Sequence, residues 1–157
     1  MSLENELGLK KGFQSVSHEA LLNVYHTASR IRKKAAEFFR DSPLTDVQFN
    51  LMVLLSDHAD ETGGLTQVQL SRMMLVNRPN ITSLIDRMER TRLVVRTPAA
   101  GDRRYNLVRL TPHGRKLLSK VEDTYAREVR KIMGALKKSE QKTLIEMLER
   151  VRERLNT

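Results

Sequence analysis

Residues 65–110 read LTQVQLSRMMLVNRPNITSLIDRMERTRLVVRTPAAGDRRYNLVRL, and this stretch decides the fold of the chain. Thr66 is followed three residues later by Gln69, a spacing typical of a capping box, in which each side chain bonds the other residue's backbone N–H. Leu65 and Leu70 flank this pair and can pack together as a hydrophobic staple. The pattern predicts a short helix at about residues 67–74.

A second short helix is predicted directly after it. Asn77 can cap this helix, and Pro79 suits its first turn because the N–H that proline lacks would have no partner there. Beyond the proline, apolar residues recur at helical spacing, so one face is expected to be buried and the opposite face polar and basic. The apolar face consists of Ile81, Leu84, Ile85 and Met88.

A β-hairpin is predicted after the second helix. Residues 93–96 and 107–110 are short β-prone runs. They flank residues 98–104, whose sequence PAAGDRR predicts a long, basic tip. Two short helices and a basic hairpin, in this order, are typical of a winged helix-turn-helix. In that fold the second helix fits the major groove of DNA, and the hairpin can reach an adjacent minor groove.

Longer helices are predicted on both sides of this lobe. Thr45 and Gln48 form a second capping box, which predicts a helix at about residues 46–58, and a helix at about residues 18–40 precedes it. Thr111-Pro112 begins a further helix, and Ser139 can cap the last one. Apolar stripes at heptad-like spacing follow these outer helices: Leu21, Val24, Ala28, Ile31, Ala35 and Phe38; Leu118, Val121, Tyr125, Val129, Ile132 and Leu136; and Leu144, Leu148, Val151 and Leu155. Core packing and contact with a second chain explain the stripe of the first helix equally well.

The predicted fold class is mainly α (α+β). A length of 157 residues allows one ordinary domain, or a small domain with an extra helical layer. The chain has no cysteine, no apolar run long enough to cross a membrane and no leader-like start. We therefore expect a soluble, cytoplasmic protein without disulfides or thiolate metal sites, and with no membrane partner.

The distribution of charge points to a polyanionic partner. The formal net charge is +9, and between residues 72 and 109 there are nine arginines, no lysine and three acidic residues. The planar guanidinium group suits phosphate oxygens and guanine edges, so an arginine-only segment favours nucleic acid.

Five fragments in the chain resemble the successive signatures of MarR-type transcriptional regulators. The most specific are Asp102-Arg103-Arg104 and, shortly after it, Leu110-Thr111-Pro112-x-Gly114. The others are Leu44-Thr45-x-x-Gln48-Phe49, Leu65-Thr66-x-x-x-Leu70 and Ile81-Thr82-x-Leu84-Ile85-Asp86-Arg87-Met88-Glu89. The resemblance covers about residues 44–155. The chain departs from the family pattern at Arg92, where a glycine is usual, so a left-handed helix end there would be strained by about 1 kcal/mol or replaced by another ending.

The resemblance implies a single chain of residues 1–157 that forms a homodimer and binds double-stranded DNA. The winged lobe would span residues 44–112, and residues 15–40 and 113–155 would supply the dimerisation helices. Arg104 would enter the minor groove and Asp102 would help to hold it. Arg103 fits a phosphate contact and a free surface side chain about equally well. In the recognition helix the candidate DNA contacts are Asn77, Arg78, Asn80, Thr82, Ser83 and Arg87, although Arg87 and Arg90 could instead pair with Asp86 or Glu89.

The family often responds to small aromatic acids or phenols. A pocket for such an effector would draw on Tyr25, His26, Phe49 and Met52, each of which also fits a plain core or surface role. The implied function is thus a sequence-specific regulator, most simply a ligand-responsive repressor on a pseudo-palindromic operator.

Two rival functions have less support in the sequence. An enzyme lacks support because the chain has no glycine-rich phosphate loop, no nucleophile elbow and no cysteine, and its four histidines have no metal-ligand spacing. No cofactor or metal is therefore expected. A basic architectural or RNA-binding protein would share the salt-dependent binding but not the sequence preference.

Overall fold

A computed structural model describes residues 2–58, 63–74, 81–99 and 102–155 of the chain, and the side chains of all of these except 99 and 102–105. The chain divides into two compact units, residues 1–51 and residues 52–157. The boundary falls inside helix α3 (Asp46–Asp57), and the two units are described separately below.

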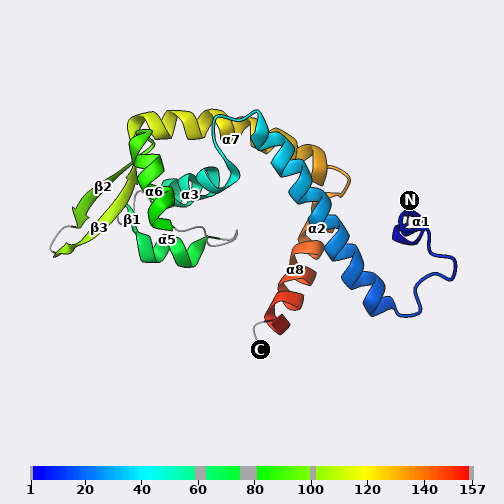
Figure 1. The fold of residues 1–157 in the computed structure, drawn as a ribbon. Helices are drawn as coiled ribbons and strands as arrows, with labels where there is room; N and C mark the ends of the chain where they lie inside the picture. Colours follow the sequence, from blue (N-terminus) through cyan, green and yellow to red (C-terminus); the bar gives the residue numbers. More distant parts are fainter. Residues whose placement is uncertain (1, 59–62, 75–80, 100–101, 156–157) are drawn as a thin grey trace. The chain divides into compact units, whose positions relative to one another are not determined.

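The first unit is helical. It contains α1 (Leu3–Leu7), which the sequence did not predict, α2 (Val16–Arg40) and the first half of α3 (Figure 1). Ser15 caps α2, so this helix begins two residues earlier than predicted. At the start of α3, Thr45 Oγ1 accepts from the backbone N–H of Gln48 at 3.3 Å, and Gln48 Oε1 accepts from that of Thr45 at 2.9 Å. The predicted capping box is therefore confirmed, and α3 ends one residue before the predicted limit.

The second unit contains the helix-turn-helix and the hairpin. Its elements are β1 (Leu65–Thr66), α5 (Gln67–Met73), α6 (Ile81–Arg90), β2 (Val94–Ala99) and β3 (Asp102–Leu110). The three strands form an antiparallel sheet in the order β1-β3-β2, and Figure 1 shows β2 and β3 as a long hairpin. The capping box of α5 is confirmed, because Thr66 and Gln69 exchange both predicted bonds.

Two features of the sheet differ from the sequence prediction. The strand β1 was not predicted; Leu65, expected only as a staple residue, pairs with Val108 across 43 positions of sequence. The segment predicted as a long tip is largely strand, because β2 runs to Ala99 and β3 begins at Asp102. A register shift between Pro98 and Ala99 lets pairing continue past the proline, which cannot donate to a ladder.

Burial in α6 and in the hairpin follows the predicted periodicities. Leu84, Ile85 and Met88 of α6 are at most 3% exposed. Ile81, also expected on the buried face of α6, is half-buried. Val94 and Val108 of the sheet are at most 1% exposed. A one-residue shift of either strand would turn these apolar residues toward solvent, so burial fixes the register of the hairpin.

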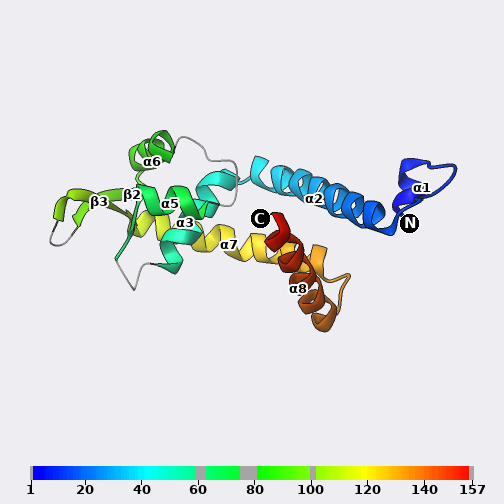
Figure 2. The same ribbon diagram turned by 90° about the horizontal axis from the view of Figure 1, so that it is seen from below.

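Two long helices complete the second unit, α7 (Pro112–Met133) and α8 (Lys138–Leu155) (Figure 2). Thr111 caps α7 as predicted, with its Oγ1 accepting from the N–H of Gly114 at 2.9 Å. The predicted cap of α8 is wrong: Ser139 lies inside the helix, and Glu140 accepts from the backbone N–H of Lys137 at 2.6 Å, which starts the helix earlier. Leu136, expected in the stripe of α7, lies beyond its end.

Among the helices of the described ranges, none combines the length and the apolar character that a membrane span requires.

Candidate nucleic-acid interface

Helix α6 has one buried face and one polar face. Its apolar side chains point into the second unit, whereas Thr82, Ser83, Arg87 and Arg90 are exposed. A helix with this division can dock by its apolar face and present its polar face to a groove. The predicted orientation of the recognition helix is thus confirmed over residues 81–90.

Several candidate contacts lie where the structure gives no side-chain positions. Asn77, Arg78 and Asn80 are outside the described residues, and Asp102, Arg103 and Arg104 are described as backbone of β3 only. The structure therefore places Thr82, Ser83 and Arg87 together on the exposed side of α6, and it places the segment 102–104 on the second strand of the hairpin.

The C-terminal end of α6 keeps the geometry that a glycine usually provides. Arg92 has a φ of 58°, in the left-handed region. The N–H of Arg92 bonds the carbonyl of Glu89, and the N–H of Leu93 bonds the carbonyl of Met88, both at 2.9 Å. These two bonds define a Schellman motif, so the first of the two predicted alternatives holds: the left-handed ending is retained with a non-glycine residue.

This helix end is tied to the start of α7. Thr111 Oγ1 donates to the carbonyl of Arg92 at 2.6 Å, and the N–H of Thr111 donates to that of Leu93 at 3.1 Å. A Cβ on Gly114 would lie 2.1 Å from the Leu93 carbonyl oxygen, so only glycine allows this approach. The Leu110-Thr111-Pro112-x-Gly114 motif therefore anchors the end of the recognition helix to the next helix.

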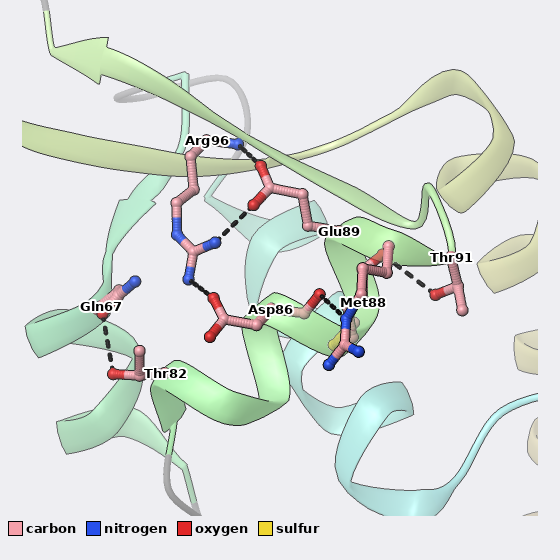
Figure 3. Close-up of polar contacts among 8 residues, drawn as sticks. Gln67, Thr82, Asp86, Met88, Glu89, Thr91 and Arg96 are labelled. Atoms are coloured by element: carbon pink, nitrogen blue, oxygen red, sulfur yellow. Dashed lines mark hydrogen bonds and ion pairs between the residues drawn. The ribbon is translucent and has the colours of Figure 1, made fainter.

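A second tie joins α6 to strand β2 through Arg96 (Figure 3). Arg96 Nη2 donates to Asp86 Oδ1 at 2.6 Å, and Nη1 donates to Glu89 Oε2 at 2.5 Å. Glu89 Oε1 also accepts from the backbone N–H of Arg96 at 3.0 Å. Because β2 is an edge strand, this carboxylate pairs a backbone donor that no neighbouring strand can reach.

The two carboxylates neutralise a partly buried cation. The Arg96 side chain is 19% exposed, compared with 48% for Asp86 and 38% for Glu89. Burial alone would lower the pKa of the Arg96 guanidinium, but hydrogen bonds and charge attraction from Asp86 and Glu89 outweigh burial and raise that pKa above its ordinary value. Arg96 is therefore charged at neutral pH.

Gln67 of α5 connects Arg96 with a candidate DNA contact. The Gln67 amide lies 3.3 Å from Thr82 Oγ1. The amide orientation drawn in Figure 3 sets donor against donor at Arg96; a rotation of 180° places the amide oxygen 3.0 Å from Nη2 and 3.1 Å from Nε. We refer to Arg96, Asp86, Glu89 and Gln67 as the Arg96 cluster.

Sequence reasoning missed this cluster. It counted Arg96 only as part of the basic excess, and it allowed Asp86 and Glu89 to pair with Arg87 or Arg90 on the helix surface; both acidic residues instead pair with Arg96. Arg90 Nε donates to the backbone carbonyl of Asp86 at 3.3 Å. The available signal was the spacing of Asp86 and Glu89, which places two acids on one side of a helix that packs on the following strand.

The four candidate effector residues are not gathered in one site. Tyr25 and His26 line a hollow of about 230 Å³ together with Leu3, Leu7 and Leu22. At its edge, Glu6 accepts from Arg30 at 2.9 Å and lies 3.1 Å from His26 Nε2; hydrogen bonds from Arg30 and then His26 lower the pKa of Glu6. Phe49 is 4% exposed and lies against Phe39, with ring centroids 5.5 Å apart, and Met52 is fully buried.

Comparisons with known proteins agree with this geometry. Residues 42–104 match the model of the MarR family. The transcriptional repressor NicR of Pseudomonas putida is 30% identical over 112 residues, 71% of this chain and 68% of that protein. The transcriptional activatory protein BadR of Rhodopseudomonas palustris is 31% identical over 100 residues, 64% of this chain and 57% of that protein.

Solved structures show the same fold. AbsC, a MarR family transcriptional regulator from Streptomyces coelicolor, superimposes with a TM-score of 0.77 at 21% identity, covering 92% of this chain and 97% of that one. The residues matched by the family model include helices α5 and α6, strand β2 and the first residues of β3. The chain belongs to the MarR family, whose members are DNA-binding transcriptional regulators rather than enzymes.

Proposed function

We propose that this protein is a sequence-specific transcriptional repressor that binds a pseudo-palindromic operator as a homodimer. The observation that carries the proposal is the exposed face of α6, where Thr82, Ser83 and Arg87 lie on a helix that Arg96 bonds along one side and Thr111 bonds at its C-terminal end. A helix presented in this way fits a major groove, and a rigid mounting is what base readout requires.

In this proposal the recognition helix contacts the major groove and the wing contacts the adjacent minor groove. Asn77, Arg78, Asn80, Thr82, Ser83 and Arg87 contact bases or phosphates in the major groove. Arg104 enters the adjacent minor groove with Asp102 beside it, and Arg103 contacts a phosphate. A narrow A·T-rich minor groove attracts an arginine most strongly.

The homodimer would form through helices outside the winged lobe of residues 44–112. The apolar stripe of α2 remains exposed, with Leu21 at 51%, Val24 at 43% and Ile31 at 44%. On α8, Val151 is 50% and Leu155 79% exposed. Exposed apolar residues in regular rows are typical of a surface that another chain covers. We assign residues 15–40 and 113–155 to this dimerisation layer.

Repression is the direction we propose because NicR, which matches this chain over 112 residues compared with 100 for BadR, is named a repressor. The effector would be a small aromatic acid or phenol. The hollow at Tyr25 and His26 is smaller than the ~300–1,000 Å³ of common ligand pockets. It would therefore hold no more than a single-ring molecule. Phe49 and Met52 would support the site as core residues and would not contact the effector directly.

The decisive experiment is selection of bound fragments from the source genome, followed by competition against bulk DNA. A regulator should prefer its selected site by about 10³-fold or more at near-physiological salt. The selected site should contain an inverted repeat, and a reporter placed behind it should be less active when the protein is present. Equal binding of selected and bulk DNA would instead identify a basic architectural protein, and preferential binding of RNA would identify an RNA-binding one.

A further inference from the structure

We infer that Arg96 is a positioning residue for base recognition: it fixes α6 on the wing strand and sets Thr82 through Gln67, without itself contacting DNA. The inference rests on the proposed sequence-specific binding and adds a residue to it. Arg96 lies in the most arginine-rich part of the chain, where every arginine would otherwise count as a DNA contact.

The donors of Arg96 are directed into the protein. A guanidinium group has five N–H donors. Nη1 donates to Glu89, Nη2 to Asp86, and the Gln67 oxygen lies within bonding distance of both Nη2 and Nε. With the side chain 19% exposed and its charge facing two carboxylates, little of this cation is left for a phosphate.

The Arg96 cluster joins three elements whose relative positions a DNA-binding lobe must keep fixed. Arg96 belongs to β2, Asp86 and Glu89 to α6, and Gln67 to α5. The second helix-turn-helix element and the wing are thus bonded to one group, which adds directional bonds to the apolar packing that holds α6. A base contact tolerates displacements of only about 0.5 Å, so a small rotation would cost recognition.

Through Gln67, the Arg96 cluster is connected to Thr82 on the exposed face of α6, which would face DNA. Its hydroxyl is exposed and lies 3.3 Å from the Gln67 amide, whose orientation is fixed by Arg96. Loss of Arg96 would free the amide to rotate and would leave the Thr82 hydroxyl without a fixed partner. The preference for the base that Thr82 faces should then relax.

The first test needs no DNA. In the full-length protein, hydrogen exchange should be compared between the parent, Arg96→Gln and the control Arg109→Gln. Arg109 is exposed on β3 of the same hairpin, and its side chain makes no ion pair with any residue in the described part of the chain. We expect amides of α6 to exchange about tenfold faster in Arg96→Gln, with α5 little changed and the control like the parent. Unchanged exchange in α6, or an equal increase in all elements, overturns the inference.

The second test separates positioning from charge. Arg96→Gln should reduce the preference for the selected site over bulk DNA by about tenfold while leaving the salt slope of bulk binding unchanged. A phosphate contact would instead lower that slope by about 0.9. Such a drop for Arg96→Gln would overturn the inference.

Glu89→Gln gives the sharpest contrast, because the two explanations predict opposite signs. Removing a negative charge beside DNA should tighten binding if only charge matters, whereas positioning requires a loss of site preference. Glu122→Gln on α7 is the control for the charge change, and Arg96→Lys, which cannot reach all three partners at once, should give an intermediate loss. Tighter binding with full preference in Glu89→Gln overturns the inference. If the parent protein prefers no sequence, the proposed function fails, and hydrogen exchange still decides the role of Arg96.

Discussion

Glu89 holds Arg96 with both of its carboxylate oxygens, one on the backbone N–H at 3.0 Å and the other on the guanidinium at 2.5 Å. One acidic residue of the recognition helix thus satisfies both an edge-strand donor and a partly buried cation. These two bonds connect helix α6 directly to strand β2.

A double-mutant cycle of Arg96→Gln and Glu89→Gln should show coupling in the free energy of unfolding. We expect about 1 kcal/mol, because the geometry is good but the Glu89 side chain is 38% exposed and water screens the charges. Urea unfolding of the four proteins measures this term. Strict additivity of the two single substitutions would show that the ion pair contributes nothing to stability.

The two capping boxes make an independent stability prediction. Thr45→Ala and Thr66→Ala should each cost about 1 kcal/mol, since each removes the acceptor for an N-terminal N–H of its helix. Thermal unfolding measures the loss. Thr143→Ala is the matched control, because within the described ranges the hydroxyl of this threonine bonds back to the carbonyl of Ser139 in α8 and caps no helix, and alanine favours a helix. DNA sequence preference should stay the same in all three variants, and a changed preference would contradict a purely local role.

Arg92→Gly should stabilise the protein. Arg92 adopts a φ of 58°, which costs a residue with a Cβ about 1 kcal/mol relative to glycine. The control is Arg90→Gly, two residues earlier and still helical, where glycine should cost about 1 kcal/mol. Opposite signs in chemical denaturation are expected. If both substitutions destabilise equally, the left-handed ending is not populated in solution.

The wing and the recognition helix should give different binding defects. Arg104→Ala should weaken binding, lower the salt slope by about one unit and relax preference only at flanking A·T pairs. Arg87→Ala or Asn80→Ala, at a true base contact, should cost about 1 to 3 kcal/mol and relax preference at one inner position of each half-site.

Footprinting on a selected site measures both effects of these substitutions. The half-sites should be about one helical turn apart, so that each inner defect appears twice. A protected site without inverted symmetry would contradict the dimeric mode of binding, as would parental affinity in Arg104→Ala at near-physiological salt.

Sedimentation should show a dimer for the intact chain. Leu21→Glu and Val151→Glu, which place a charge in the exposed stripes of α2 and α8, should shift the equilibrium toward monomer. Val68→Glu is the control, because Val68 is equally exposed, at 59%, but lies on α5 within the winged lobe. A monomeric parent protein at micromolar concentration would rule out the proposed dimer.

The capping boxes at Thr45 and Thr66, the buried face of α6 and the order of helix-turn-helix and wing could all be predicted from the sequence. These features depend on residues three or four positions apart, so the interactions that create them can be found along the chain. The same local reasoning failed at Ser139, because Glu140 reached the N–H of Lys137 and started α8 earlier than a serine cap would.

The partners of residues far apart in the sequence could not be predicted and are known from the fold. Leu65 pairs with Val108 because the sheet brings β1 to β3, and Asp86 and Glu89 bind Arg96 rather than their helical neighbours because β2 packs against α6. When a charged side chain has several opposite charges within reach, geometry and burial determine which ion pair forms. Neither can be read from the spacing of residues along the sequence. For that reason the arginine count indicated a DNA-binding segment, and the fold alone assigned Arg96 to a partly buried group of ion pairs.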